Sequence, residues 1–132
     1  MNGKRNIVTG LFVMALFMAY GFLLIYLRDF APGKEAWIEN YIKGSHFESR
    51  LAHVHGNLFA LLNIVIGYLL LQFKDRLSNT KIISWLAVAG ILMPVGILME
   101  VYLSFPPVFV LIGAIAMVLS VLILAGAFYK MK

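Results

Sequence analysis

Residues 48–68 have the sequence ESRLAHVHGNLFALLNIVIGY, and the interpretation of the whole chain depends on this stretch. It is apolar and long enough to cross a bilayer as a helix, which takes about 20 residues. After the polar residues 48–50, four more polar side chains interrupt its apolar part, namely His53, His55, Asn57 and Asn63. Polar and ionisable groups are costly at membrane depth, so residues of this kind mark candidate functional sites.

The composition indicates an integral membrane protein. Of the 132 residues, 62% are hydrophobic and 13% are charged, whereas about a quarter of the residues of a soluble domain are charged. The apolar residues fall in four runs, at about 7–27, 51–73, 82–103 and 108–129. We therefore expect one domain with an all-α fold, a four-transmembrane-helix bundle. The first run is expected to be a retained span, because a cleaved signal peptide, the alternative, has a shorter apolar region.

The distribution of charge predicts the orientation of the bundle. Four spans place both termini and the turn at 74–81 on the same side of the membrane. Seven basic residues on that side face a single acidic one, Asp75: they are Lys4, Arg5, Lys74, Arg76, Lys81, Lys130 and Lys132. The positive-inside rule then predicts cytoplasmic termini, in a bacterial inner membrane. This asymmetry explains the net charge of +5 without any nucleic-acid partner.

The segments between the spans carry their own signals. Residues 28–50 form a polar connection, in which residues 36–42 are expected to make a short interfacial helix with Trp37 and Tyr41 at headgroup depth. His46, in the same connection, is expected to be solvated. Pro94 lies inside the third apolar run and is expected to bend that helix, since proline removes one backbone hydrogen bond.

The topology predicts a layer of polar residues at the end of the bundle opposite the termini. His53, His55 and Asn57 lie in the first half of the second span, and Glu100 and Tyr102 lie near the end of the third. Because these two spans run in opposite directions, all five residues are expected at a similar depth. The sequence contains no cysteine, so thiolate ligands and covalently attached haem are excluded.

Spacing along the second span sorts these side chains by face. His53 and Asn57 are four residues apart and share a face, which Ala60 and Gly67 continue. Small residues there would allow another helix or a flat ligand to come close. His55 is two residues from His53 and therefore points about 200° away. The two histidines are expected to serve different partners rather than chelate one metal.

A neutral imidazole in a helical bundle is a common axial ligand of haem. We therefore expect haem b as a cofactor, with His53 as the metal ligand and His55, Ala60 and Glu100 near the cofactor; the residues alone leave His55 open as the ligand. Zinc would require three or four ligands, which His53, Glu100 and a water provide poorly.

Structural roles are the alternative for each of these polar residues. The histidines could hydrogen-bond to neighbouring helices or lie at the wet interface. Glu100 could extend to that interface or pair with Arg50. Asn63 lies deeper in the span and could form a hydrogen bond between helices, a contact that stabilises a membrane protein by about 1 kcal/mol.

Short motifs spread along the chain resemble those of styrene oxide isomerase and its relative hydroxylaminobenzene mutase. The matching pieces are Gly44-Ser45, Arg50-Leu51-Ala52-His53, Phe73-Lys74-Asp75-Arg76 and Tyr102-Leu103-Ser104-Phe105-Pro106. A weaker resemblance links His53-Val54-His55-Gly56 to the helix of haem–copper oxidases in which two histidines serve different haems.

The first resemblance implies a homotrimer with haem b between protomers, ligated by His53. It also implies that ferric haem acts as a Lewis acid, opening an epoxide to a carbonyl compound without net redox change. Tyr102 and an amide six residues after the histidine would hold the substrate. Phe59 occupies that position here, so Asn57 or Asn63 is expected to replace the missing amide.

Three functions are therefore considered. The first is a haem-dependent isomerase that acts on a small apolar epoxide arriving from the membrane lipid. The second is a non-enzymatic haem protein for electron transfer or gas sensing. The third is a structural membrane subunit without a cofactor.

Overall fold

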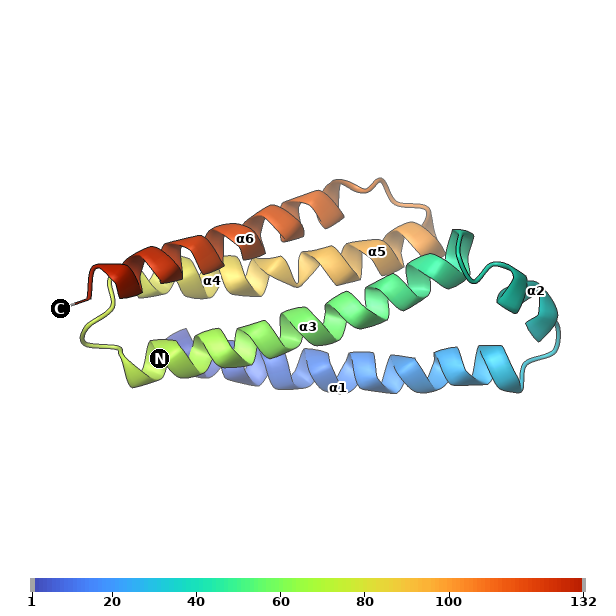
Figure 1. Cartoon of the computed structure of the whole chain (residues 1–132), viewed down its shortest axis with the longest axis horizontal. Helices are drawn as coiled ribbons and strands as arrows, with labels where there is room; N and C mark the ends of the chain where they lie inside the picture. The colour runs from blue at the N-terminus through green and yellow to red at the C-terminus, as the bar shows by residue number, and fades with distance from the viewer. Residues whose placement is uncertain (1, 132) are drawn as a thin grey trace.

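The computed structural model of the protein describes residues 2–131, and all regular structure in that range is helical. The helices are α1 (Asn2–Asp29), α2 (Lys34–Glu39), α3 (Gly44–Gln72), α4 (Thr80–Gly90), α5 (Leu92–Leu103) and α6 (Val108–Tyr129) (Figure 1). Four segments are long and apolar enough to cross a membrane: α1 from Gly3, α3, α4 together with α5, and α6. The predicted helical fold with four candidate spans is confirmed.

The helices are arranged in two pairs along the long axis of the molecule. α1 lies beside α3, and α6 lies along α4 and α5 (Figure 1). α3 also contacts α5, so this helix joins the two pairs. α1 begins and α6 ends at one end of the bundle, which we call the terminal end, and α2 lies at the other, which we call the α2 end (Figure 1). This arrangement is the one that an even number of spans predicts.

The third span is broken at the position that the proline predicted. α4 ends at Gly90 and α5 begins at Leu92, and Pro94 is buried just after the break. Proline has no N–H with which to reach the carbonyl of the residue four positions earlier. At the break, the Ile91 N–H donates to the Val88 carbonyl, 3.1 Å away, as in a 3₁₀ turn.

The second span begins earlier than its apolar run. α3 starts at Gly44 rather than near residue 51, because helical hydrogen bonding continues through the polar residues before the membrane segment. A short helix is present in the polar connection, as predicted: it is α2, which ends at Glu39, so Tyr41 follows it in a turn.

The early start of α3 corrects the expectation for His46, which is only 3% exposed. Its ring stacks on Trp37 with ring centroids 4.5 Å apart, and the Tyr41 ring lies nearly perpendicular to it with centroids 5.4 Å apart. Nδ1 of His46 lies 2.6 Å from the Trp37 carbonyl oxygen and donates to it. The expectation of a solvated His46 was wrong because α2 folds back over the first turn of α3.

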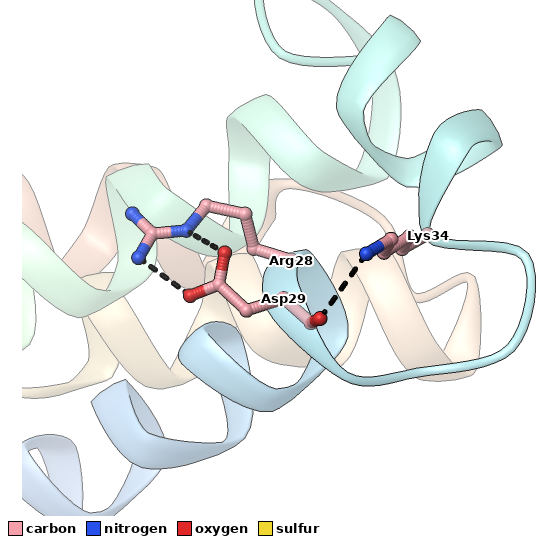
Figure 2. Close-up of polar contacts among 3 residues, drawn as sticks. All are labelled: Arg28, Asp29 and Lys34. Atoms are coloured by element: carbon pink, nitrogen blue, oxygen red, sulfur yellow. Dashed lines mark hydrogen bonds and ion pairs between the residues drawn. The ribbon is translucent and has the colours of Figure 1, made fainter.

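Polar contacts close the end of α1 that faces this connection. The Lys34 ammonium donates to the Asp29 carbonyl at 3.3 Å (Figure 2). A cation at this position also interacts favourably with the negative end of the helix dipole. The contact ties the start of α2 to the end of α1 and so helps to hold the short helix in place.

Candidate functional site

A groove of about 790 Å³ runs between α1 and α3 near the α2 end. Its walls are mostly apolar side chains, and its polar members come from both helices and from the turn after α2. The lining residues are Met18, Gly21, Phe22, Leu24, Ile25, Arg28, Tyr41, His46, Arg50, His53, Val54 and Asn57. This volume lies within the range of about 300–1,000 Å³ that is usual for small-molecule and cofactor sites.

His53 lines this groove in one defined tautomer. Its Nδ1 lies 2.8 Å from the Phe17 carbonyl oxygen of α1. A carbonyl oxygen can only accept a hydrogen bond, so Nδ1 carries the proton. In the tautomer that this contact selects, Nε2 is the nitrogen that carries the lone pair. Metal-ligating imidazoles commonly donate their other ring nitrogen to a backbone carbonyl in this way, although His46 and His55 also do so here.

Gly21 provides the space that the His53 ring occupies. A Cβ atom placed on Gly21 would lie 2.7 Å from Cε1 of His53, closer than atoms can normally approach. The ring therefore lies against the bare backbone of α1. The sequence analysis did not identify Gly21, and one glycine within an apolar run gives no signal by which it could have been found.

Asn57 shares the groove with His53, as the four-residue spacing predicted. Its amide nitrogen donates to the His53 carbonyl oxygen, 2.9 Å away within α3. The same nitrogen lies 3.5 Å from Nδ1 of His53, but both atoms carry protons, so this second contact is not a hydrogen bond. One N–H of the Asn57 amide therefore remains for a ligand.

His55 lies outside the groove. Its Nδ1 donates to the Leu51 carbonyl of its own helix at 2.9 Å, and its ring meets the edge of Phe59 with centroids 6.2 Å apart. The two histidines therefore point to different surroundings, as their spacing predicted. Within one chain they do not provide two ligands to a single metal ion.

Tyr102 is at the α2 end, as expected, but it does not line the groove. Its hydroxyl lies 3.0 Å from that of Tyr20, and the Tyr102 side chain is 52% exposed. Tyr20, from α1, is the link to the histidine, because its ring centroid lies 6.4 Å from that of His53. Tyr20 was missed in the sequence, where its one signal is a polar ring inside an apolar span.

Two other predicted site residues are also outside the groove. Ala60 is fully buried where α1 crosses α3: a Cβ on Gly10 would lie 2.6 Å from the Ala60 carbonyl oxygen. The small residues on this face therefore admit a helix there, not a ligand. Glu100 lies half-buried on α5, and Arg50 contacts Tyr41 instead of Glu100.

Asn63 belongs to a separate polar network toward the terminal end. Ten residues separate it from His53, which is about 15 Å along a helix. Its amide nitrogen donates to the carbonyls of Phe59 and Ala87 at 3.0 and 2.8 Å, and its oxygen accepts from Asn6 at 3.0 Å. Because α1, α3 and α4 all contribute, this network joins helices, which is the structural alternative for Asn63.

The donor set of the groove suits a cofactor that brings most of its own ligands. Within residues 2–131, no three His, Cys, Asp or Glu side chains gather closely enough to hold a metal ion. A zinc site of the usual kind is therefore not formed by these side chains. Haem supplies its own equatorial nitrogens and needs one axial imidazole, which His53 can provide.

Comparisons with known proteins add no assignment: no family model, curated protein or solved structure matches this chain.

Proposed function

We propose that this protein binds haem b in the groove between α1 and α3, with Nε2 of His53 as the axial ligand. The observation that carries the proposal is that His53 lines the groove with Nδ1 donating to the Phe17 carbonyl of the other helix at 2.8 Å, so that Nε2 is the ring nitrogen available to a metal. The groove volume and its apolar walls support a flat, largely apolar ligand. Of the predicted cofactor contacts, His53 is the one that lines this groove.

On the resemblance to styrene oxide isomerase, we further propose isomerisation of a small apolar epoxide to a carbonyl compound. When bound, ferric haem supplies a Lewis acid that draws electron density from the epoxide oxygen. The chain's own residues would hold the cofactor and orient the substrate. His53 would hold the iron, and Asn57 lines the same groove beside it, with one amide N–H bonded within α3. The apolar walls admit a substrate from the bilayer.

The place of Tyr102 supports an assembly of more than one copy. Within one chain its hydroxyl is bound to Tyr20 and lies outside the groove, yet the side chain is half exposed. We propose a homotrimer in which Tyr102 of one protomer approaches the groove of the next. The exposed apolar lining residues Phe22 and Val54 would then be covered at the contact.

Replacement of His53 tests the cofactor. We expect purified protein to show a Soret band that is lost in His53→Ala, because the iron then lacks its axial ligand. His55→Ala is the matched control: it removes an imidazole two residues away that bonds within its own helix, so the band should persist. A Soret band that survives His53→Ala and disappears in His55→Ala would show that the ligand is wrongly assigned.

Turnover tests the reaction. The ferric, haem-loaded protein should convert aryl or alkyl epoxides to carbonyl compounds without added reductant, and dithionite should slow the conversion. Tyr102→Phe should slow it by at least about tenfold, the value of one lost hydrogen bond of about 1.5 kcal/mol, while the Soret band is unchanged. If a haem-loaded ferric sample leaves a panel of epoxides intact, the isomerase proposal is wrong and the non-enzymatic haem protein remains.

A further inference from the structure

Two arginines line the groove at the α2 end, and their surroundings differ. Nε and Nη2 of Arg28 donate to the two carboxylate oxygens of Asp29 at 2.9 and 2.8 Å (Figure 2). Arg50 has no carboxylate partner among residues 3–131. Its Nη1 donates to the Tyr41 carbonyl at 3.2 Å, and its guanidinium lies 3.8 Å above the Tyr41 ring. Among the described residues, Arg28 therefore has a carboxylate partner and Arg50 does not.

The setting of Arg50 prepares it for a planar anion. A guanidinium keeps its charge at any physiological pH and presents five N–H donors in a rigid fork. The guanidinium lies over the Tyr41 ring, and the Tyr41 carbonyl uses one of its donors. The side chain is half-buried at the edge of an apolar groove, where charge-assisted hydrogen bonds are stronger than in bulk water. A carboxylate is the partner that suits this geometry best.

We propose that Arg50 binds a propionate carboxylate of the haem and so sets the direction in which the haem lies in the groove; this rests on the proposed function. Haem b carries its two propionates on one edge. Arg50 precedes His53 by three residues, which places it about 4.5 Å closer to the α2 end along α3. The acidic edge of the haem therefore points to the α2 end, and the apolar edge points along the groove into the span.

A phospholipid phosphate has similar chemistry and could compete for Arg50. The groove favours the haem carboxylate because His53, the proposed iron ligand, and Arg50 line the same cavity from one helix. A single amphiphile with a flat apolar body and an acidic edge would engage both residues. Arg28, by contrast, is already paired with Asp29.

The test compares haem with its dimethyl ester, in which both propionates are esterified and uncharged. The full-length protein, freed of haem and reconstituted in phosphatidylcholine nanodiscs, is titrated with each compound and followed by its Soret band. Wild type should bind haem at least about tenfold more tightly than the ester, since hydrogen bonds to charged groups contribute about 1.5–3 kcal/mol. This comparison requires no variant, so a folding defect cannot obscure it.

Two substitutions then locate the effect. Arg50→Gln should bind haem only as tightly as it binds the ester, whereas Lys43→Gln, at an exposed basic residue outside the groove lining, should keep the wild-type preference. Equal binding of haem and ester by wild type, with a Soret band that depends on His53, would overturn the carboxylate role and leave the proposed haem site intact. Absence of a His53-dependent band with either compound would instead refute the proposed function.

A third measurement distinguishes a haem carboxylate from a phospholipid phosphate as the anion that Arg50 binds. If Arg50 holds a phospholipid headgroup, Arg50→Gln should lower the amount of phosphatidylglycerol that copurifies, and wild type should not distinguish haem from its ester. That result would overturn the proposal. A preference for haem that is the same in nanodiscs with and without phosphatidylglycerol supports it.

Discussion

Nδ1 of His53 is bound by a carbonyl of the adjacent helix, whereas Nδ1 of His55 is bound by a carbonyl of its own. The Phe17 carbonyl belongs to α1, so the orientation of the His53 ring depends on how α1 and α3 pack. Nδ1 of His55 donates to the Leu51 carbonyl, one turn earlier in α3, so this bond does not depend on another helix. Of two histidines two residues apart, only His53 has its orientation fixed by the tertiary structure.

Gly21→Ala should disturb the His53 ring without adding a polar group. The new Cβ would lie 2.7 Å from Cε1 of His53, so the ring must move and its bond to Phe17 is weakened. We expect haem affinity to fall by about 10–100-fold, the usual effect of losing a group that orients a metal ligand. The measurement is the haem dissociation constant from Soret titration.

Gly126→Ala is the control for this change, because a Cβ on Gly126 meets nothing within 4 Å. Haem affinity should be unaffected there. Wild-type affinity in Gly21→Ala would show that α1 does not fix the ring of His53.

At the scale of elements, the seam between α1 and α3 decides the shape of the groove. Toward the terminal end the two helices meet backbone to backbone at Gly10 and Ala60, and again at Gly3 and Gly67. Toward the α2 end, large side chains such as Phe17 and Tyr20 enter the seam, and the groove opens there. The small residues therefore let the two helices close together toward the terminal end, and the larger residues keep them apart toward the α2 end.

Gly10→Leu should force this seam apart. Its Cβ would lie 2.6 Å from the Ala60 carbonyl oxygen, and a backbone atom inside a helix cannot move aside as a flexible side chain can. We expect the free energy of unfolding to fall by about 1–3 kcal/mol, the usual cost of overpacking. Unfolding in mixed micelles with increasing dodecyl sulfate measures it.

Gly126→Leu adds the same side chain at an exposed position of α6 and should leave the stability nearly unchanged. If the two variants are equally stable, the seam does not pack as closely as described.

At the scale of the whole molecule, the polar groups form two separate layers. The groove with His53 and Arg50 lies toward the α2 end, and the network of Asn63 with Asn6 lies toward the terminal end. In the latter the Ser84 hydroxyl donates to Asn6, whose amide in turn donates to the Ser84 carbonyl at 3.0 Å. Because its groups bond to one another, this layer joins helices, whereas the groove at the α2 end is open.

The orientation in the membrane can be tested directly because the chain contains no cysteine. Lys43 and Ser78 are both exposed and lie in turns near opposite ends of the bundle. Since the basic residues concentrate at the terminal end, we predict that this end faces the cytoplasm. In intact cells a membrane-impermeant maleimide should therefore label Lys43→Cys and leave Ser78→Cys unlabelled, until the cells are opened. The reverse pattern would invert the proposed topology.

The sequence alone determined the four helical spans, the break near Pro94 and the shared face of His53 and Asn57. These features follow from hydrophobicity and from the helical repeat, which depend on residues close together in the chain. Only the tertiary structure showed that Phe17, Gly21 and Tyr20 surround His53. It also showed that Ala60 and Asn63 lie outside the groove and that His46 is buried. Those outcomes depend on how far each helix is rotated about its axis and how closely it approaches its neighbour. Packing between residues distant in the chain decides the rotation and the approach of each helix, and neither can be derived from the spacing of residues within one helix.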